Sequence, residues 1–102
     1  MFISKCNIFA DGLSVSSDGS KRWYLNGWYH REDGPAIEHA NGDKEWFQHG
    51  LLHRTDGPAV ELVNGRKGWY LNDGSYRSIQ HYCKALSMSE EEQLLFILKW
   101  SK

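Results

Sequence analysis

Short stretches of alternating apolar and polar residues, separated by glycine-containing turns, occupy the first three quarters of the chain. Four dipeptides mark two-residue hairpin turns, which need positive φ at both centres: Asn26-Gly27, Asn41-Gly42, His49-Gly50 and Asn64-Gly65. Asp33-Gly34-Pro35 and Asp56-Gly57-Pro58 form wider connections, where proline suits a strand edge or start. The pattern predicts an antiparallel meander of seven to nine short strands, seven of them at about 20–25, 28–31, 36–40, 43–48, 51–54, 59–63 and 66–71.

The last quarter of the chain changes to a helical period. Ser78 is expected to cap a helix that runs to about Leu86. Its apolar stripe has the spacing i, i+3, i+4, i+7: Ile79, Tyr82, Cys83 and Leu86. Ser87 and Glu90 have the spacing of a capping box and predict a second helix to about Trp100. Residues 94–98 of that helix are apolar on nearly all sides. We therefore expect the helix either to be buried between other elements or to expose part of its apolar surface to a partner.

A repeat of 23 residues underlies the strand region. Residues 23–45 read WYLNGWYHREDGPAIEHANGDKE and residues 46–68 read WFQHGLLHRTDGPAVELVNGRKG, with twelve identical positions and no gap. Trp69 opens a third unit that stops near Arg77, and residues 11–19 resemble a decayed half-unit. We therefore expect one domain over 1–102: a degenerate N-terminal cap (1–22), repeat 1 (23–45), repeat 2 (46–68), a partial repeat (69–78) and a helical tail (79–102).

Two-residue turns would also set the strand pairing and so the two faces of the sheet. One face is predicted to carry Trp23, His30, Ile37, Trp46, His53, Val60, Trp69 and Tyr76, with Ile37 opposite Trp46 and Val60 opposite Trp69. The other face is predicted to carry Tyr24, Tyr29, Phe47, Leu52 and Tyr70, with Ala36 and Ala59 at strand starts. The tail is expected to cover the C-terminal end of the first row through Ile79, Tyr82, Leu86, Leu94, Ile97 and Leu98. The second row would then stay open.

Composition and charge narrow the class of protein. Twelve basic and thirteen acidic residues leave a net charge of −1, which argues against a general nucleic-acid or anionic-membrane binder. The sequence has no apolar run long enough to span a membrane and no signal-peptide pattern at its start. Cys6 and Cys83 are too few for a disulfide scaffold or a zinc site, which favours free thiols and a cytoplasmic location.

The polar residues of the repeat have structural interpretations. His30 and His53 should lie about 10 Å apart, two strands away from each other, which is too far for one metal ion. We expect each to be a packed histidine that hydrogen-bonds its own loop. Arg31 with Asp33, and Arg54 with Asp56, are expected to brace their loops. Because catalytic sites normally break a repeat and this one is unbroken, the sequence predicts no catalytic residue, metal or cofactor.

The form Gly-x-x-His-Arg-x-Asp-Gly-Pro-Ala resembles a divergent MORN-type repeat of small phage and large-DNA-virus proteins. The matching residues are Gly27, His30, Arg31, Asp33, Gly34, Pro35 and Ala36, then Gly50, His53, Arg54, Asp56, Gly57, Pro58 and Ala59. The resemblance covers about residues 10–78. Ordinary MORN units carry Gly directly after the His, where Arg31 and Arg54 stand here, so lipid binding is not carried over. The resemblance implies a curved β-meander that mediates protein contacts in a host cytoplasm, as an inhibitor or modulator of a host defence protein.

We therefore expect a non-enzymatic protein–protein interaction module. The residues expected to bind the partner are the second row with its hairpin tips and two loop arginines: Tyr24, Trp28, Tyr29, Phe47, Leu51, Leu52, Tyr70, Arg31 and Arg54. Self-association, or the Phe2-Ile3 segment, would be an alternative cover for that face. Another alternative is a small ligand or carbohydrate, because residues 68–75 resemble the aromatic hairpins of choline- and glucan-binding repeats. A third is single-stranded nucleic acid, stacked on aromatics beside Lys21, Arg22, Lys44, Arg66 and Lys67.

Overall fold

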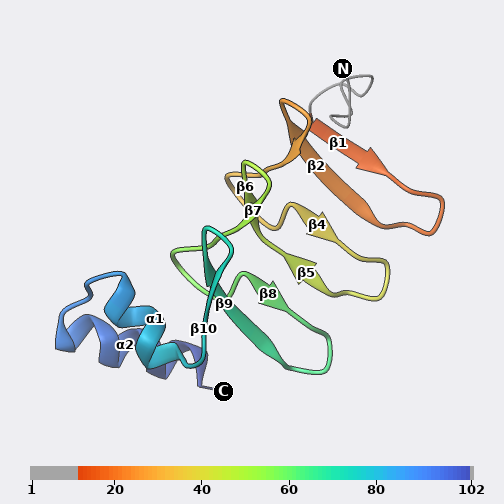
Figure 1. Ribbon diagram of the computed structural model, residues 1–102. Coiled ribbons are helices and arrows are strands. Elements are labelled where there is room, and N and C mark those ends of the chain that lie inside the picture. The colour runs from red at the N-terminus through yellow and green to blue at the C-terminus, as the bar shows by residue number, and fades with distance from the viewer. Residues whose placement is uncertain (1–11, 102) are drawn as a thin grey trace.

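The computed structural model describes residues 12–101. Phe2, Ile3 and Cys6, for which the sequence suggested roles, lie outside this range. The described chain is mainly β, with two helices at its C-terminal end, as predicted (Figure 1). In order, the elements are β1 (Gly12–Val15), β2 (Lys21–Leu25), β3 (Trp28–Tyr29), β4 (Ile37–Glu38), β5 (Lys44–Glu45), β6 (Phe47–Gln48), β7 (Leu51–Leu52), β8 (Val60–Glu61), β9 (Lys67–Leu71), β10 (Gly74–Tyr76), α1 (Ile79–Ala85) and α2 (Glu90–Trp100).

The strands form an elongated antiparallel array. Each repeat contributes two arms to it: a hairpin arm (β2–β3, then β6–β7) and a sheet arm within the main sheet (β4–β5, then β8–β9). The main sheet has the order β1-β2-β4-β5-β8-β9-β10, with β3 paired to β2, while β6 and β7 form a separate hairpin. Among the described residues there are ten strands rather than seven to nine. One reason is that the predicted strand 43–48 divides at Trp46: its first half pairs in the main sheet and its second half enters the hairpin. In Figure 1 the β6–β7 and β9–β10 hairpins lie in succession along one side of the array.

The turns at Asn41-Gly42 and Asn64-Gly65 differ from the prediction. Ile37 pairs with Glu45 and Val60 pairs with Gly68, one residue away from the expected register. His39 N donates to the carbonyl of Asp43, Gly42 N donates to the carbonyl of His39, and Gly42 has φ 102°. This is a three-residue loop, a type I turn followed by a left-handed glycine, which Asn-Gly also suits. The predicted two-residue turns are confirmed at Asn26-Gly27 and His49-Gly50.

This register changes the composition of the first row. Trp23 N donates to the carbonyl of Ala36, and Trp46 N donates to the carbonyl of Ala59. Both alanines are fully buried. Continued across the sheet, the pairing gives a ladder in which indoles alternate with methyl groups: Leu13, Trp23, Ala36, Trp46, Ala59, Trp69 and Tyr76. The placing of Ile37 and Val60 in this row is wrong, because a one-residue shift moves a side chain to the opposite face.

The two helices begin at serine caps. Ser78 accepts a hydrogen bond from His81 N at the start of α1, as predicted. The capping box of α2 is formed by Ser89 and Glu92, not by Ser87 and Glu90. Ser87 instead takes a left-handed conformation, with φ 59°, in the connection between the helices. The box is therefore displaced by two residues, because the chain must first turn before the second helix can start.

The helices close the end of the sheet against Trp69. The ring centroid of Trp69 lies 4.9 Å from that of Tyr82 and 6.2 Å from that of Trp100. Tyr82 and Cys83 are fully buried. The predicted cover over Trp69 and Tyr76 is confirmed, but Leu94 and Leu98 are about 60% exposed and do not take part. Phe96 and Trp100, on the other side of α2, pack inward instead. No helix within residues 12–101 is long and apolar enough to cross a membrane.

Candidate functional site

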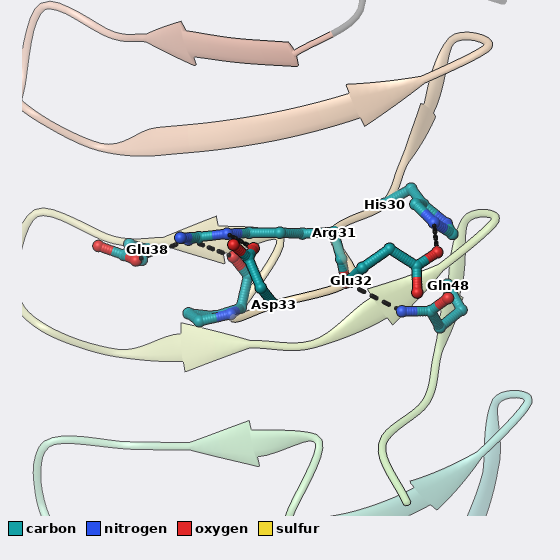
Figure 2. A network of polar contacts seen from close by, with 7 residues as sticks. His30, Arg31, Glu32, Asp33, Glu38 and Gln48 are labelled. Carbon is teal, nitrogen blue, oxygen red and sulfur yellow. Dashed lines mark hydrogen bonds and ion pairs between the residues drawn. The ribbon is translucent and has the colours of Figure 1, made fainter.

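Arg31 lies at the centre of the loop that connects the hairpin arm to the main sheet in repeat 1. Its Nε donates to Asp33 Oδ1 at 3.0 Å, and its Nη1 donates to the carbonyl of Pro35 at 3.2 Å and to Glu38 at 3.1 Å (Figure 2). The guanidinium carbon stands 3.8 Å from the ring centroid of Trp23. One side chain therefore joins the loop, the next strand and the indole ladder.

Arg54 repeats this arrangement in repeat 2. It donates to Asp56 at 2.8 Å, to the carbonyl of Pro58 at 3.0 Å and to Glu61 at 2.8 Å. Its guanidinium carbon lies 3.9 Å from the centroid of the Trp46 ring. The predicted loop-bracing pairs are thus present in both repeats, and each arginine bonds acceptors of its own unit.

The histidines connect one hairpin to the next. His30 Nδ1 accepts the backbone N–H of His49 at 2.9 Å, and His53 Nδ1 accepts that of Asn72 at 3.1 Å. Because Nδ1 accepts, Nε2 of neutral His30 carries the proton and donates to Glu32, 2.6 Å away. The expectation that each histidine bonds its own loop holds for this Glu32 contact only. The Nδ1 bond reaches the turn of the following unit.

Backbone and ring contacts join the same hairpins. Gly50 N donates to the carbonyl of Tyr29 at 2.8 Å. The Trp28 indole lies against Gly50, where a Cβ would come within 2.7 Å of the ring. The ring centroids of Tyr24 and Tyr29, and of Tyr29 and Phe47, are each 5.3 Å apart. Three of the five members of the predicted second row, Tyr24, Tyr29 and Phe47, therefore form a half-buried stack.

The remaining members of that row lie in the second and third hairpins. Leu52 pairs with Phe47, and the carbonyl of Leu52 accepts from Asp73 N at 2.8 Å. The carbonyl of Tyr70 accepts from Arg54 N at 3.3 Å. These contacts place Leu52 and Tyr70 at the junction between repeats 2 and 3, where they connect hairpins as Tyr29 does one repeat earlier.

A groove of about 860 Å³ lies between the two arginine loops. Its lining comes from both loops, from the β6–β7 hairpin and from the tip of the next hairpin: Arg31, Glu32, Asp33, Gly34, Pro35, Trp46, Gln48, His49, Leu51, His53, Arg54, Thr55, Asp56 and Asn72. The two arginine side chains are 22% and 15% exposed, while Asp33 and Asp56 are more than 80% exposed. The groove therefore presents carboxylates at its rim above arginines that are already paired.

The groove contains three of the residues predicted to bind a partner, namely Arg31, Arg54 and Leu51. The stack of Tyr24, Tyr29 and Phe47 does not line it. Gln48 was not among the residues expected from the sequence, yet its Nε2 donates to the carbonyl of Arg31 at 2.9 Å. No repeat signal could have revealed this contact, because the equivalent position in the next unit is Leu71.

At the C-terminal end of the array, Tyr82 bonds the carbonyl of Arg54, as Gln48 bonds the carbonyl of Arg31 between the repeats. The Tyr82 hydroxyl has one proton and lies within hydrogen-bonding distance of two carbonyls, that of Arg54 and, at 3.0 Å, that of Gly57. Burial of the ring raises the pKa of Tyr82 to about 12. Burial also raises the pKa of the neighbouring Cys83 thiol, which is free.

The fold and the groove define a short β-hairpin repeat protein with a helical end cap. Within residues 12–101 no three His, Cys, Asp or Glu side chains gather in a way that could hold a metal ion. Comparisons of the chain with protein-family models, with curated proteins and with solved structures give no match.

Proposed function

We propose that this protein is a non-enzymatic interaction module that binds a segment of another protein in the groove between its repeats. The observation that carries the proposal is the groove itself, about 860 Å³ in volume and formed only where two repeats meet. Leu51 in its lining is 38% exposed, and Trp28, whose indole lies against the neighbouring Gly50, is 53% exposed. A concave surface with exposed apolar side chains at its border has the features of a recognition site.

The bonding of the repeat residues supports binding rather than catalysis. Arg31 and Arg54 each satisfy two carboxylates and a carbonyl of their own unit. His30 uses both ring nitrogens within the fold. A general base or an electrostatic catalyst needs free bonding capacity toward a substrate, and these groups direct most of theirs to the fold: three of the five N–H donors of each arginine and both ring nitrogens of His30.

The charge of the rim favours a basic segment in the partner. Glu32, Asp33 and Asp56 are each more than three quarters exposed. Each aspartate offers one oxygen to its arginine and turns the remaining carboxylate surface to solvent. Lysine or arginine side chains of a bound segment would meet these carboxylates, while an apolar side chain would contact Leu51.

We also propose that the chain is a divergent MORN-type repeat protein. The support is the recurrence of one contact set in both units: arginine on tryptophan, arginine on aspartate, and histidine on the next hairpin. A role as a phage-encoded inhibitor or modulator of a host defence protein, acting in the host cytoplasm, rests on that resemblance alone.

Single-stranded nucleic acid is the less favoured alternative. Lys21, Lys44 and Lys67 alternate with glutamates across the main sheet, in the pairs Lys21–Glu38, Glu38–Lys44, Lys44–Glu61 and Glu61–Lys67. Each lysine thus has an acidic neighbour on the adjacent strand, which weakens the positive potential that a phosphate backbone needs. The carbohydrate or small-ligand alternative rests on the aromatic hairpin at residues 68–75, whose Trp69 is buried against the aromatic rings of the two helices. The Tyr24, Tyr29 and Phe47 rings pack on one another.

Site-specific photo-crosslinking tests the proposal. A photoreactive residue at position 51 should crosslink a discrete protein in the lysate of the natural host, and the same residue at position 15 should not. Val15 is the matched control, because it is an exposed apolar residue outside the groove lining. The captured partner should then bind Leu51→Asp at least tenfold more weakly than Val15→Asp. Equal capture at both positions, or stabilisation by glycans or oligonucleotides instead, would refute binding in the groove.

A further inference from the structure

Helix α2 carries an apolar stripe that the rest of the described chain leaves uncovered. Leu94, Leu95 and Leu98 are 59%, 61% and 60% exposed, although Phe96 and Trp100 of the same helix pack inward on Trp69. These are three of the eight large hydrophobic residues exposed in residues 12–101, and they share one helix face. Glu91 belongs to the same face, at i−3, i−4 and i−7 from the leucines.

This stripe faces away from the strands. β1 and the helices lie at opposite ends of an array 46 Å long (Figure 1). The described residues that pack on α2 do so on its Phe96 and Trp100 side, and the three leucines remain about 60% exposed.

We propose that a second copy of this chain covers the stripe, with the two α2 helices packed antiparallel about a twofold axis. The charges along α2 support this occupant. Glu90, Glu91 and Glu92 fill the first turn, and Lys99 is the basic residue of the last turn. An antiparallel pair brings the acidic turn of each copy to the lysine of the other, and it also opposes the helix dipoles. A parallel pair would place glutamates against glutamates.

The dimer joins the closed ends of two arrays and leaves both grooves free. An 11-residue helix offers a small contact area, so the association belongs to the weak class rather than to obligate dimers. The pairing nonetheless gives one assembly two grooves, and hence avidity for a partner that offers two segments. The helix pairing is independent of the groove's function, since no residue of α2 lines the groove.

Sedimentation equilibrium of the full chain from about 10 µM to about 500 µM tests the proposal. The expected mass rises from 11.8 kDa toward twice that value as the concentration increases. Leu95→Glu and Leu98→Glu should each weaken the association at least tenfold, while their far-UV circular dichroism stays that of the wild type. Val15→Glu is the matched control, because Val15 is 58% exposed on β1, away from the helices, and should leave the association unchanged.

Charge reversal tests the antiparallel arrangement. Lys99→Glu should lower self-association severalfold, because it removes two attractive contacts from the dimer. Glu91→Lys should do the same, and an equimolar mixture of the two variants should associate again. Glu92 is left intact because its side chain belongs to the capping box.

Three results would overturn the proposal. The first is a mass that stays at 11.8 kDa up to the highest concentration. The second is self-association that Leu95→Glu leaves intact. The third is a Lys99→Glu variant that associates as the wild type does, since a parallel pair would exchange one like-charge contact for another.

Discussion

Arg54 shows how much one side chain does in this fold. It bonds Asp56, the carbonyl of Pro58 and Glu61, and it covers the Trp46 ring. Gly57 makes room for it, because a Cβ there would come within 2.7 Å of the guanidinium carbon. Lysine could keep the charge, but its single ammonium could neither form the planar fork nor stack on the indole.

Arg54→Lys is therefore expected to destabilise the protein by about 1–3 kcal/mol, since charge-assisted hydrogen bonds and the cation–π contact are lost together. Urea unfolding monitored by tryptophan fluorescence measures the change. Arg66→Lys is the control, because Arg66 is an exposed turn residue. Equal midpoints for the two variants would contradict the structural role of Arg54.

Tyr82 makes stability depend on alkaline pH. Its pKa is raised to about 12 from 10.0 in the unfolded chain, so the folded state resists ionisation. This contribution to the free energy of unfolding is complete below pH 10 and is lost as pH rises from about 10 toward 12. The total loss by pH 12 is about 2 kcal/mol. Unfolding midpoints between pH 8 and pH 11.5 should fall more steeply in the wild type than in Tyr82→Phe. Parallel pH profiles would remove Tyr82 as the cause.

At the scale of elements, adjacent repeats are joined by two side-chain acceptors that recur at the same positions. His30 and His53 accept from the turn of the next hairpin arm. Ser20 and Asp43 accept from the turn of the next sheet arm, through Ala40 N and Val63 N. The bond from Val63 holds the pKa of Asp43 below its usual value, so this contribution is lost as pH falls through the acid range. Each arm is thus fastened separately to its neighbour.

Replacing His30 tests the hairpin connection. His30→Ala should cost about 1–3 kcal/mol, because it leaves the N–H of His49 without an acceptor beside a buried ring site. His30→Asn should recover part of that loss, since Oδ1 of asparagine occupies the place of Nδ1. Chemical denaturation, with hydrogen exchange of the His49 amide, distinguishes the two variants. If the asparagine variant is no better than alanine, the Nδ1 bond is not what joins the hairpins.

At the scale of the whole molecule, the repeats stack in one direction and the helices cap the last unit. Arg66 stands where Ser20 and Asp43 stand in earlier units, and arginine has no acceptor to offer a further repeat. Tyr76 stands where His30 and His53 stand, and its ring packs edge-on against Tyr82. Trp69 in the end unit is covered by aromatic rings of α1 and α2. Trp23 and Trp46 in the two repeats are covered by arginines instead.

The array should therefore accept an additional unit. A copy of residues 23–45 inserted after Glu45 is expected to fold and to raise Tm by about 3–8 °C, since each new junction adds neighbour contacts. The control is the same insertion with alanine at the positions of His30 and Asp43 in the upstream copy. If the control melts at the same temperature as the intact insertion, the junction bonds do not stabilise the array.

The sequence by itself determined the class of fold, the order of its elements and the closing of its end by helices. It could do so because these features depend on local chemistry: glycine turns, the 23-residue period and serine caps. It also predicted the arginine–aspartate pairs, whose partners lie two residues apart. The sequence also predicted Arg31, Arg54 and Leu51 as binding residues. It did not show that they line one groove, because that groove lies between two stacked repeats.

Tertiary structure decided what local signals left open. Asn26-Gly27 and Asn41-Gly42 have the same sequence, yet the first forms a two-residue turn and the second a three-residue loop. The three-residue form recurs at Asn64-Gly65, although no described residue lies on Gly65 as Val63 lies on Gly42. In both loops the asparagine side chain accepts the N–H two residues on, Asn41 from Asp43 and Asn64 from Arg66. That single residue of register places Ala36 and Ala59, rather than Ile37 and Val60, between the tryptophans. The Asn-Gly dipeptide is compatible with both turns, so the choice becomes visible only in the pairing of the main-sheet strands with their neighbours on either side.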